Sequence, residues 1–299
     1  METTYSLKKL IELLGKNQFA LLLRIIFERY PILILGNHPN EVDNLLDGVI
    51  SLAPHRHLFI FFNDFIEPDE HQQLIQEELD DFNLPRTIFS SPSNASKHIF
   101  NRIDQLKGWV IGFNLNGYSK NEIIQKIEKI EEKFLVILME QNGLKLFLYG
   151  VKNDSLDLFF EKKLIDKAIQ KTEIALEKMK RVIKKRIKST PSNEVMGAIM
   201  RFDSEEEKIR TNVFIQEVQS FVQAGMRALA ILSRLDLLRE LGFKIELSGK
   251  TLLETIDYEE VSAERILQLI NAEYGVDFSS CIRGGKAVQV GDRIDGFWG

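Results

Sequence analysis

Residues 31–63, PILILGNHPNEVDNLLDGVISLAPHRHLFIFFN, contain the signals that decide the fold. The run Ile32–Leu35 is short, apolar and branched, which favours a buried strand. Gly36 follows it and can adopt the positive φ that a sharp turn requires. Pro39 suits the first turn of a helix, and Leu58–Phe62 is a second apolar run. The stretch therefore predicts a strand, a turn, a helix and a second buried strand, which is the unit that builds parallel sheets.

The turn after the first strand has the position of a phosphate-binding loop but lacks the residues of one. Such a loop reads G-x-x-x-x-G-K-[ST], in which backbone amides and the lysine hold phosphates and the hydroxyl holds magnesium. Counted from Gly36, the last three positions contain Glu41, Val42 and Asp43. Carboxylates in the first turn of a helix suit the helix dipole without any ligand. The sequence therefore favours a degenerate phosphate loop over tight nucleotide binding.

The alternation of strands and helices continues to residue 152. A broken helix is expected over residues 6–30, and later helices over 67–82 and 93–107 and from Ser119, where Glu122 completes a capping box. Further strands are expected at residues 87–91, 109–115, 134–139 and 144–149. Asn142-Gly143 predicts a hairpin between the last two strands. Residues 1–152 are thus predicted to form a three-layer α/β domain with a mainly parallel sheet of about six strands.

The composition changes after Gly150. Residues 156–187 and 203–241 show long helical patterns, separated by the loop 189–193, which is the best linker candidate. Residues 153–241 are therefore predicted to be a helical region. Residues 242–299 are predicted to form a small α+β segment that ends in a glycine-rich tail.

The stretch 161–188 is basic, with eleven Lys and Arg against four Asp and Glu. A polyanion could bind such a helix. A solvated face of a long Lys/Glu helix is the favoured interpretation, because such helices are common.

The overall composition limits the classes of protein to consider. The chain has 299 residues, 44% of them hydrophobic, and a formal net charge of −5, which gives no general reason to expect nucleic acid. The single cysteine, Cys281, excludes an internal disulfide and fits a reducing compartment. No apolar run approaches the roughly 18 residues of a membrane span. We expect a cytoplasmic protein.

Motifs for catalysis or metal binding are weak. Gly249-Lys250-Thr251 matches only the end of a phosphate loop, because the glycine required five residues earlier is Lys244. His55 and His57 could join Asp64 at a metal ion, but Asp64 lies about 23 Å further along an extended strand. The sequence therefore predicts no catalytic residue, no metal site and no cofactor.

One alternative ligand site remains open. Gly36, Asn37, Asp64 and Asn114 are all expected at the carboxyl ends of strands. Open α/β sheets bind ligands at this edge. A divergent nucleotide- or small-ligand-responsive protein would use these four residues.

The stretches LLLRIIFERYPILILG, NEVDNLLDGVISLAP, HLFIFF, GWVIGFNL and FLVILMEQNGLKLF, within residues 21–149, resemble the central block of DENN-module proteins, including folliculin-like members. The resemblance lies in spacing and apolar pattern, and the connection 67–101 is longer than the family's usual one. It implies action on Rab-type small GTPases through surface contact and transfers no catalytic residue. A degenerate phosphate-loop hydrolase is the second resemblance.

Taken together, these features favour a non-enzymatic regulatory or scaffold protein. The expected partner is another protein, with a small GTPase as the candidate, and the long helices are expected to support a homo-oligomer.

Overall fold

The computed structural model describes residues 5–61, 68–82, 84–99, 102–106, 108–141, 143–151, 156–187, 202–243 and 245–283. The chain divides into two compact units, Met1–Val218 and Gln219–Gly299. The division falls inside the long helix at residues 202–240. It therefore coincides with neither of the domain boundaries predicted at residues 152 and 241. The predicted linker 189–193, the predicted site residue Asp64 and the glycine-rich tail from residue 284 lie outside the described residues.

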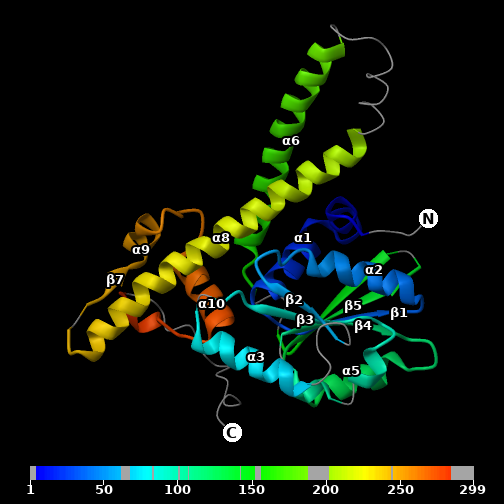
Figure 1. Ribbon diagram of the computed structural model, residues 1–299, viewed down its shortest axis with the longest axis horizontal. Helices are drawn as coiled ribbons and strands as arrows, with labels where there is room; N and C mark the ends of the chain where they lie inside the picture. The colour runs from blue at the N-terminus through cyan, green and yellow to red at the C-terminus, as the bar shows by residue number, and fades with distance from the viewer. Residues whose placement is uncertain are drawn as a thin grey trace. The chain divides into compact units, whose positions relative to one another are not determined.

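The first unit contains the predicted mainly parallel sheet (Figure 1). Its strands are β1 (Ile32–Gly36), β2 (His57–Ile60), β3 (Thr87–Ser91), β4 (Trp109–Asn114), β5 (Phe134–Glu140) and β6 (Gly143–Tyr149). Their spatial order is β2-β3-β4-β1-β5-β6, and only β6 is antiparallel to its neighbour. The α/β fold class and the closing hairpin are confirmed.

Helices cover both faces of this sheet, as the three-layer prediction requires. They are α1 (Leu7–Phe27), α2 (Pro39–Ile50), α3 (Pro68–Asp80), α4 (Ser96–Ile99), the 3-10 turn η1 (Ile103–Gln105) and α5 (Lys120–Glu128). In Figure 1, α1 and α2 lie above the sheet and α3 and α5 below it. The apolar strands β1, β4 and β5 are buried on both faces, which explains why they read as continuous apolar runs.

The face toward α4 and α5 holds one apolar core. It takes alternate residues from the central strands and the inward isoleucines of the helices: Leu33, Leu35, Trp109, Ile111, Phe113, Phe134, Val136, Ile99, Ile103, Ile123, Ile124 and Ile127. Because side chains alternate along each strand, the intervening residues, such as Ile32, Ile34, Val110, Leu135 and Ile137, are left for the opposite face. The core therefore follows directly from strand pleating.

Three local expectations are wrong. Strand β2 is not buried, since its residues are exposed or half-buried, because it lies at the edge of the sheet. The helix expected over 93–107 is instead two short pieces, α4 and η1, in the described residues. Ser119 does cap α5, but its side chain makes no capping hydrogen bond, so the capping box does not form.

Helix α1 is broken, as predicted. Gly15 has φ 66° and ψ 164°, values outside the helical region, and the helix continues on either side of it. Buried Arg24 in the second half pairs with Glu28 at 2.5 Å and faces Glu161 of the long helix α6 at 3.8 Å. These charges tie the sheet layer to α6.

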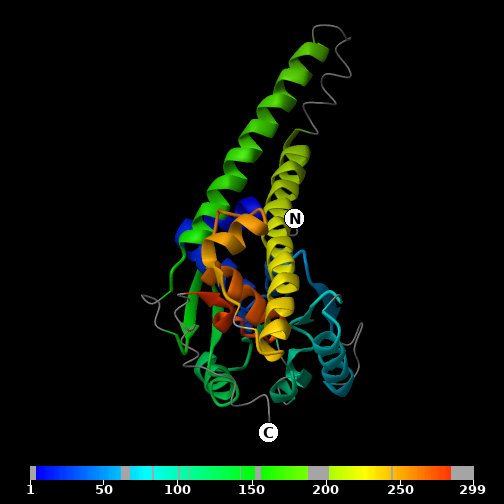
Figure 2. The same ribbon diagram turned by 90° about the vertical axis from the view of Figure 1, so that its left-hand side faces the viewer.

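Two long helices follow the sheet. They are α6 (Phe159–Ile187) and α8 (Phe202–Glu240), close to the predicted ranges. Within the first unit, α6 packs on α1 and its far end extends well beyond the sheet (Figures 1 and 2). The Phe19 and Phe214 rings lie 6.2 Å apart, so the beginning of α8 also packs on α1.

The second unit is small and mainly helical. It contains the later part of α8, β7 (Leu247–Ser248), α9 (Gly249–Thr255), α10 (Ala263–Tyr274), the 3-10 turn η3 (Ser279–Cys281) and β8 (Ile282–Arg283). Strands β7 and β8 pair in parallel. The predicted small α+β character is therefore present in the described residues, although the strand β8 was not predicted.

No helix within the described ranges combines the length and the apolar character needed to cross a bilayer.

Candidate functional site

The carboxyl ends of β1 and β4 form the place where an open α/β sheet would bind a ligand. These two strands are neighbours in the sheet. After β1 the chain continues to β2, toward one edge of the sheet, and after β4 it continues to β5, toward the opposite edge. Such a reversal of direction marks the topological switch point. Gly36 and Asn114 are direct partners in the register of the two strands.

Three of the four predicted site residues meet at this point. The amide of Leu115 donates to the carbonyl of Gly36 at 2.8 Å, which continues the ladder past Asn114. The side-chain amide of Asn116 donates to the carbonyl of Asn37 at 3.0 Å. Asn114 uses its side-chain oxygen locally, accepting from the amide of Asn116 at 3.0 Å. The sequence thus placed Gly36, Asn37 and Asn114 together correctly, but it did not find Asn116.

Val42 of α2 fills the space between the two strands at the switch point. A Cβ on Gly36 would lie 2.7 Å from Val42 Cγ2, and a Cβ on Gly112 would lie 2.9 Å from Val42 Cγ1. Val42 itself is fully buried. Each methyl group of Val42 therefore lies against one of the two glycines, so α2 packs closely on the ends of both strands.

Gly36 has a different role from the one predicted. Among the described residues, Gly36 is not one of the glycines that have a positive φ. Its missing side chain serves the close approach of α2 to the sheet, because Val42 and Met139 both lie against it. The prediction of a positive φ at this turn is wrong.

Asp43 closes the same region from the side. Its two carboxylate oxygens accept from the backbone amide of Ser93 at 2.7 Å and from the Ser93 hydroxyl at 3.0 Å. Asp43 stands where a phosphate loop would have its magnesium-binding hydroxyl, yet here it joins α2 to the loop after β3. Sequence reasoning missed Ser93, because a contact across 50 residues leaves no local signal.

The first turns of α2 carry negative charge. Glu41 lies in the first turn and is exposed, and His38 caps the helix without a side-chain hydrogen bond. Burial raises the pKa of Asp47 above its usual value, and the charge of Asp43 raises it further. Burial and the charge of Glu41 likewise raise the pKa of Tyr5. A bound phosphate would add to this negative charge, so the electrostatics oppose an anionic ligand.

The raised pKa of Asp47 leads to a testable stability change. An acid whose pKa is raised on folding contributes stability below its unfolded pKa, and this contribution is lost as pH rises through the folded pKa. We expect Asp47→Asn to increase the free energy of unfolding at pH 7 by less than about 1 kcal/mol, because the Asp47 side chain is only partly buried and water screens its charge. Urea denaturation at pH 7 and pH 4 checks this.

The gain from Asp47→Asn should shrink at pH 4, where an appreciable fraction of the wild-type carboxyl is protonated. Asp104→Asn, which changes an exposed carboxyl on η1, is the matched control and should change little at either pH. Destabilisation by Asp47→Asn at pH 7 would contradict the assignment.

A second group of charges lies between α6 and α8 in the first unit. Lys167 and Lys171, one turn apart on α6, both contact the carboxylate of Glu217 on α8, Lys167 at 2.9 Å. The Glu217 side chain is only 4% exposed. Burial alone would raise the pKa of Glu217, but the hydrogen bonds and charges of Lys171 and Lys167 outweigh it and lower that pKa. Glu217 is therefore a charged anchor between the long helices.

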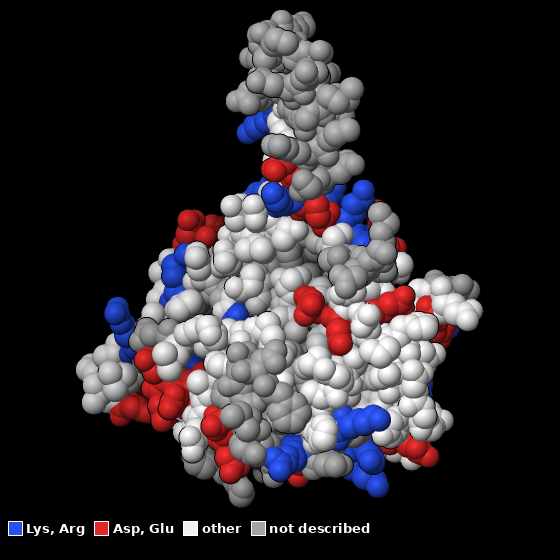
Figure 3. All heavy atoms as spheres, turned by 45° about the vertical axis from the view of Figure 1, so that its right-hand side comes forward, with Lys and Arg blue, Asp and Glu red and all other residues white. Residues whose placement is uncertain are grey.

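The ion pairs of the basic stretch 161–188 support its interpretation as a solvated helix face. Two of its lysines neutralise Glu217, Arg181 pairs with Glu177 on the same helix, and Asp166 pairs with Lys16. On the face drawn in Figure 3, acidic and basic side chains are intermixed. These contacts favour the solvated and internally paired helix over a polyanion site.

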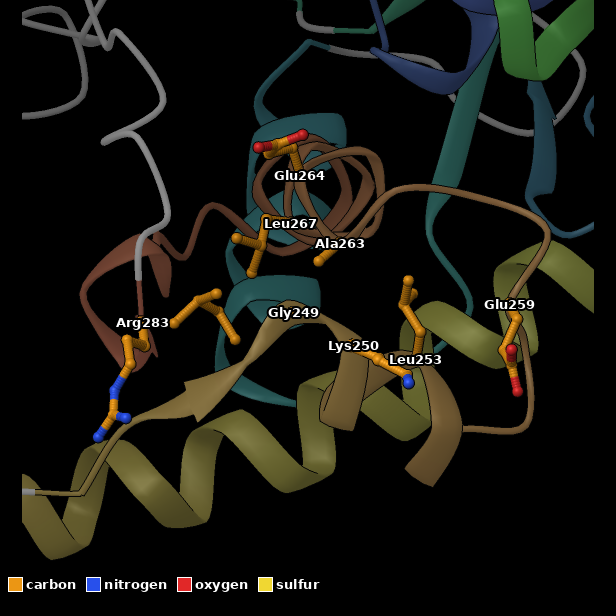
Figure 4. Close-up of a pocket in the computed structure, with 9 residues that line it drawn as sticks. Gly249, Lys250, Leu253, Glu259, Ala263, Glu264, Leu267 and Arg283 are labelled. Carbon is orange, nitrogen blue, oxygen red and sulfur yellow. The ribbon is translucent and has the colours of Figure 1, made fainter.

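The second unit contains an open cavity of about 400 Å³ between α9, α10 and β8 (Figure 4). Leu253, Leu267 and Ile282 supply its apolar lining. Lys250 and Arg283 stand at its rim, and both side chains are largely exposed. The cavity can admit a small apolar group, but its described lining includes no histidine or cysteine that could act as a nucleophile or base.

The partial phosphate-loop match at the edge of this cavity has a structural explanation. The Ser248 hydroxyl accepts from the amide of Thr251 at 3.0 Å and caps α9. A Cβ on Gly249 would lie 3.0 Å from the Cβ of Ala263, so the glycine allows α9 and α10 to approach. Lys250 lies 3.6 Å from Glu254 on the same helix. Capping and packing therefore account for Ser248-Gly249-Lys250-Thr251.

Among the described residues, no group of three or more His, Cys, Asp and Glu side chains could hold a metal ion. Cys281 is buried and accepts from the guanidinium of Arg239 at 3.4 Å. Arg239 has a raised pKa, first because of this hydrogen bond, and Asp236 and Glu246 add to the effect. These contacts place Cys281 in the packing of the second unit.

Comparison with protein-family models, curated proteins and solved structures finds no match for this chain. The resemblances to DENN modules and to phosphate-loop hydrolases therefore remain predictions.

Proposed function

We propose that this chain is a non-enzymatic regulatory or scaffold protein that acts through contacts with other proteins. The observation that carries the proposal is the filled switch point, where Val42 occupies the gaps beside Gly36 and Gly112. An α/β sheet that binds a nucleotide or small substrate needs open space at this edge. Here Val42 packs tightly against both glycines, so binding is proposed to occur on the outer surface.

The long helices offer a surface for protein contact. Helix α6 has 29 residues, which at about 1.5 Å per residue gives roughly 43 Å of length. Exposed Phe159 (70%) and Ile174 (50%) lie along it. Large apolar side chains in water are typical of protein interfaces when they gather on an extended element. The proposed compartment is the cytoplasm, which the single buried Cys281 supports.

A nucleotide titration separates this proposal from the alternative. We expect no change in the melting temperature of the full chain with millimolar Mg-ATP or Mg-GTP. A ligand with a Kd of about 10 µM would add about 2.7 kcal/mol of stability at 1 mM, which is a shift of several degrees. A saturable shift would overturn the proposal and support the nucleotide- or small-ligand-responsive function. Mg-ADP and inorganic phosphate complete the panel.

The alternative function has one observation in its favour. Gly36, Asn37 and Asn114 do converge at the switch point, and Asn37 is exposed there. An uncharged ligand at the outer rim would contact Asn37 and Asn116 without displacing Val42. Asn37→Ala together with Asn116→Ala should abolish any such shift and leave the melting temperature of the free protein nearly unchanged.

The small-GTPase partner is the finer part of the proposal and has its own test. A panel of Rab-type GTPases loaded with fluorescent GDP is mixed with the full chain, and nucleotide release is followed with time. Faster release with one member supports a DENN-like exchange activity through surface contact. No change in release and no binding in any nucleotide state would remove the GTPase partner and leave the scaffold proposal to other proteins.

A further inference from the structure

The part of α8 in the second unit is apolar on two opposite faces. One face is buried in the unit and includes Phe221, Ala224, Ala228 and Leu232. The other face is exposed and carries Met226, Ala230, Leu237 and Leu241. Met226 is 42%, Leu237 57% and Leu241 68% exposed. At about 100° per residue, these four exposed positions lie within about 60° of arc, so they form one stripe.

This stripe is not explained by the packing of the chain itself. A helix that packs with one face on its own domain normally presents polar residues to water on the other. Leu241 extends the stripe past the last residue of the helix, because its amide still bonds to the carbonyl of Leu237 at 3.2 Å. An exposed apolar stripe of this kind marks an interaction surface.

The two edges of the stripe carry opposite charges. Arg234 lies along one edge and Glu240 along the other, and both are exposed. Neither has an ion-pair partner in the portion of the chain that the structure describes. A helix with an apolar seam and charged flanks has the pattern of a paired helix, in which flanking charges choose the partner and its direction.

The charge pattern selects one orientation of a self-pair. In an antiparallel pair related by a two-fold axis, each edge of the stripe faces the same edge of the second copy, so arginine would meet arginine. In a parallel pair, each edge faces the opposite edge, so Arg234 of one copy lies toward Glu240 of the other. Only the parallel arrangement is complementary, because like charges that face each other destabilise the interface.

We propose that the exposed stripe of α8 pairs with the same stripe of a second copy of this chain, in parallel and in register. Ala230 then lies in the seam between the two helices, where its small side chain lets them approach closely, and Leu237 packs against its counterpart. This inference goes beyond the proposed function, since either a scaffold or a ligand-responsive protein can be a dimer.

The size of the stripe predicts the strength of the pair. Residues 226–241 span about 24 Å at roughly 1.5 Å per residue, which is about two heptads. Such an area lies at the small end of specific interfaces, so the expected Kd is in the micromolar range. Self-association must therefore be measured up to high protein concentration.

Sedimentation velocity of the full chain from 1 to 100 µM tests the pairing. We expect a shift from monomer to dimer over this range, and Leu237→Glu should raise the Kd by about tenfold or more. Ile130→Glu is the matched control, since it places a glutamate on an exposed apolar residue of the first unit and should leave the Kd unchanged. A wild-type chain that stays monomeric at 100 µM would overturn the proposal, as would equal effects of the two variants.

Cysteine cross-linking tests the direction. Ala230→Cys should form a disulfide-linked dimer under mild oxidation, because residue 230 faces itself in a parallel in-register pair, whereas an antiparallel pair of the full stripe places it opposite residue 237. Lys250→Cys, on the exposed face of α9, is the control and should form no disulfide-linked dimer, and neither should the wild-type chain with its buried Cys281. The chain could instead be dimeric in sedimentation but form a disulfide-linked dimer only when Ala230→Cys is mixed with Leu237→Cys. That result would overturn the parallel arrangement in favour of the antiparallel one.

Discussion

Gly36→Ala is expected to lower the free energy of unfolding by about 1–3 kcal/mol, although it adds a single methyl group. The added Cβ would lie 2.7 Å from Val42 Cγ2 and 3.1 Å from Met139 Sδ. Val42 cannot move aside easily, because a β-branched side chain in a helix has essentially one rotamer and its other methyl already lies against Gly112. Urea denaturation of the purified variant measures the loss.

A double-mutant cycle shows whether Val42 is the cause. Val42→Ala alone should cost about 1.5–3 kcal/mol for the buried methyl groups that it removes. The double variant Gly36→Ala/Val42→Ala should be more stable than the sum of the two single effects by about 1 kcal/mol or more, because the new methyl occupies the vacated space. Asn37→Ala, next to Gly36 but exposed, is the control and should change stability by less than about 0.5 kcal/mol. Additive effects would mean that the switch point is not filled in the way described.

Glu217→Gln is expected to lower the free energy of unfolding by about 1–3 kcal/mol at pH 7, because it removes the charge that two lysines share. Since the pKa of Glu217 is lowered on folding, its contribution is present above the unfolded pKa and is lost as pH falls through the folded pKa. The difference between wild type and variant should therefore be largest near neutral pH and should shrink below about pH 4.

Glu177→Gln provides the matched comparison for Glu217→Gln. Glu177 also pairs with a basic residue on α6, but both side chains of that pair are at least 70% exposed. Exposed pairs of this kind contribute little, so the expected change is below about 0.5 kcal/mol. Equal losses in the two variants would show that burial of Glu217 between α6 and α8 does not matter. Hydrogen exchange around Lys167 and Lys171 should increase only in Glu217→Gln.

Most of the sheet architecture could be predicted from periodicity. Strands such as Trp109–Asn114 and Phe134–Glu140 are short apolar runs between polar helices, and their bounds agree closely with the expected ones. The hairpin followed from its turn residues, and the break in α1 followed from Gly15. These features depend on neighbours in sequence, which is why a local pattern is enough to find them.

The candidate site was only half predictable. The sequence placed Gly36, Asn37 and Asn114 at strand ends, and the parallel pairing of β1 with β4 brought them together. It gave no sign that Val42 would close the space or that Asp43 would bind Ser93. The exposure of β2 was missed for the same reason, since an edge strand and a central strand differ only in what lies beside them.

The amino-acid sequence by itself determined the order of helices and strands, the mainly parallel sheet and the absence of a complete phosphate loop, because each depends on residue type and spacing along the chain. Only the tertiary structure decided which gap Val42 fills, which charges surround Glu217 and which face of α8 stays in water. These outcomes depend on contacts between residues far apart in sequence, and such contacts are fixed by strand order and helix packing, which no local pattern encodes.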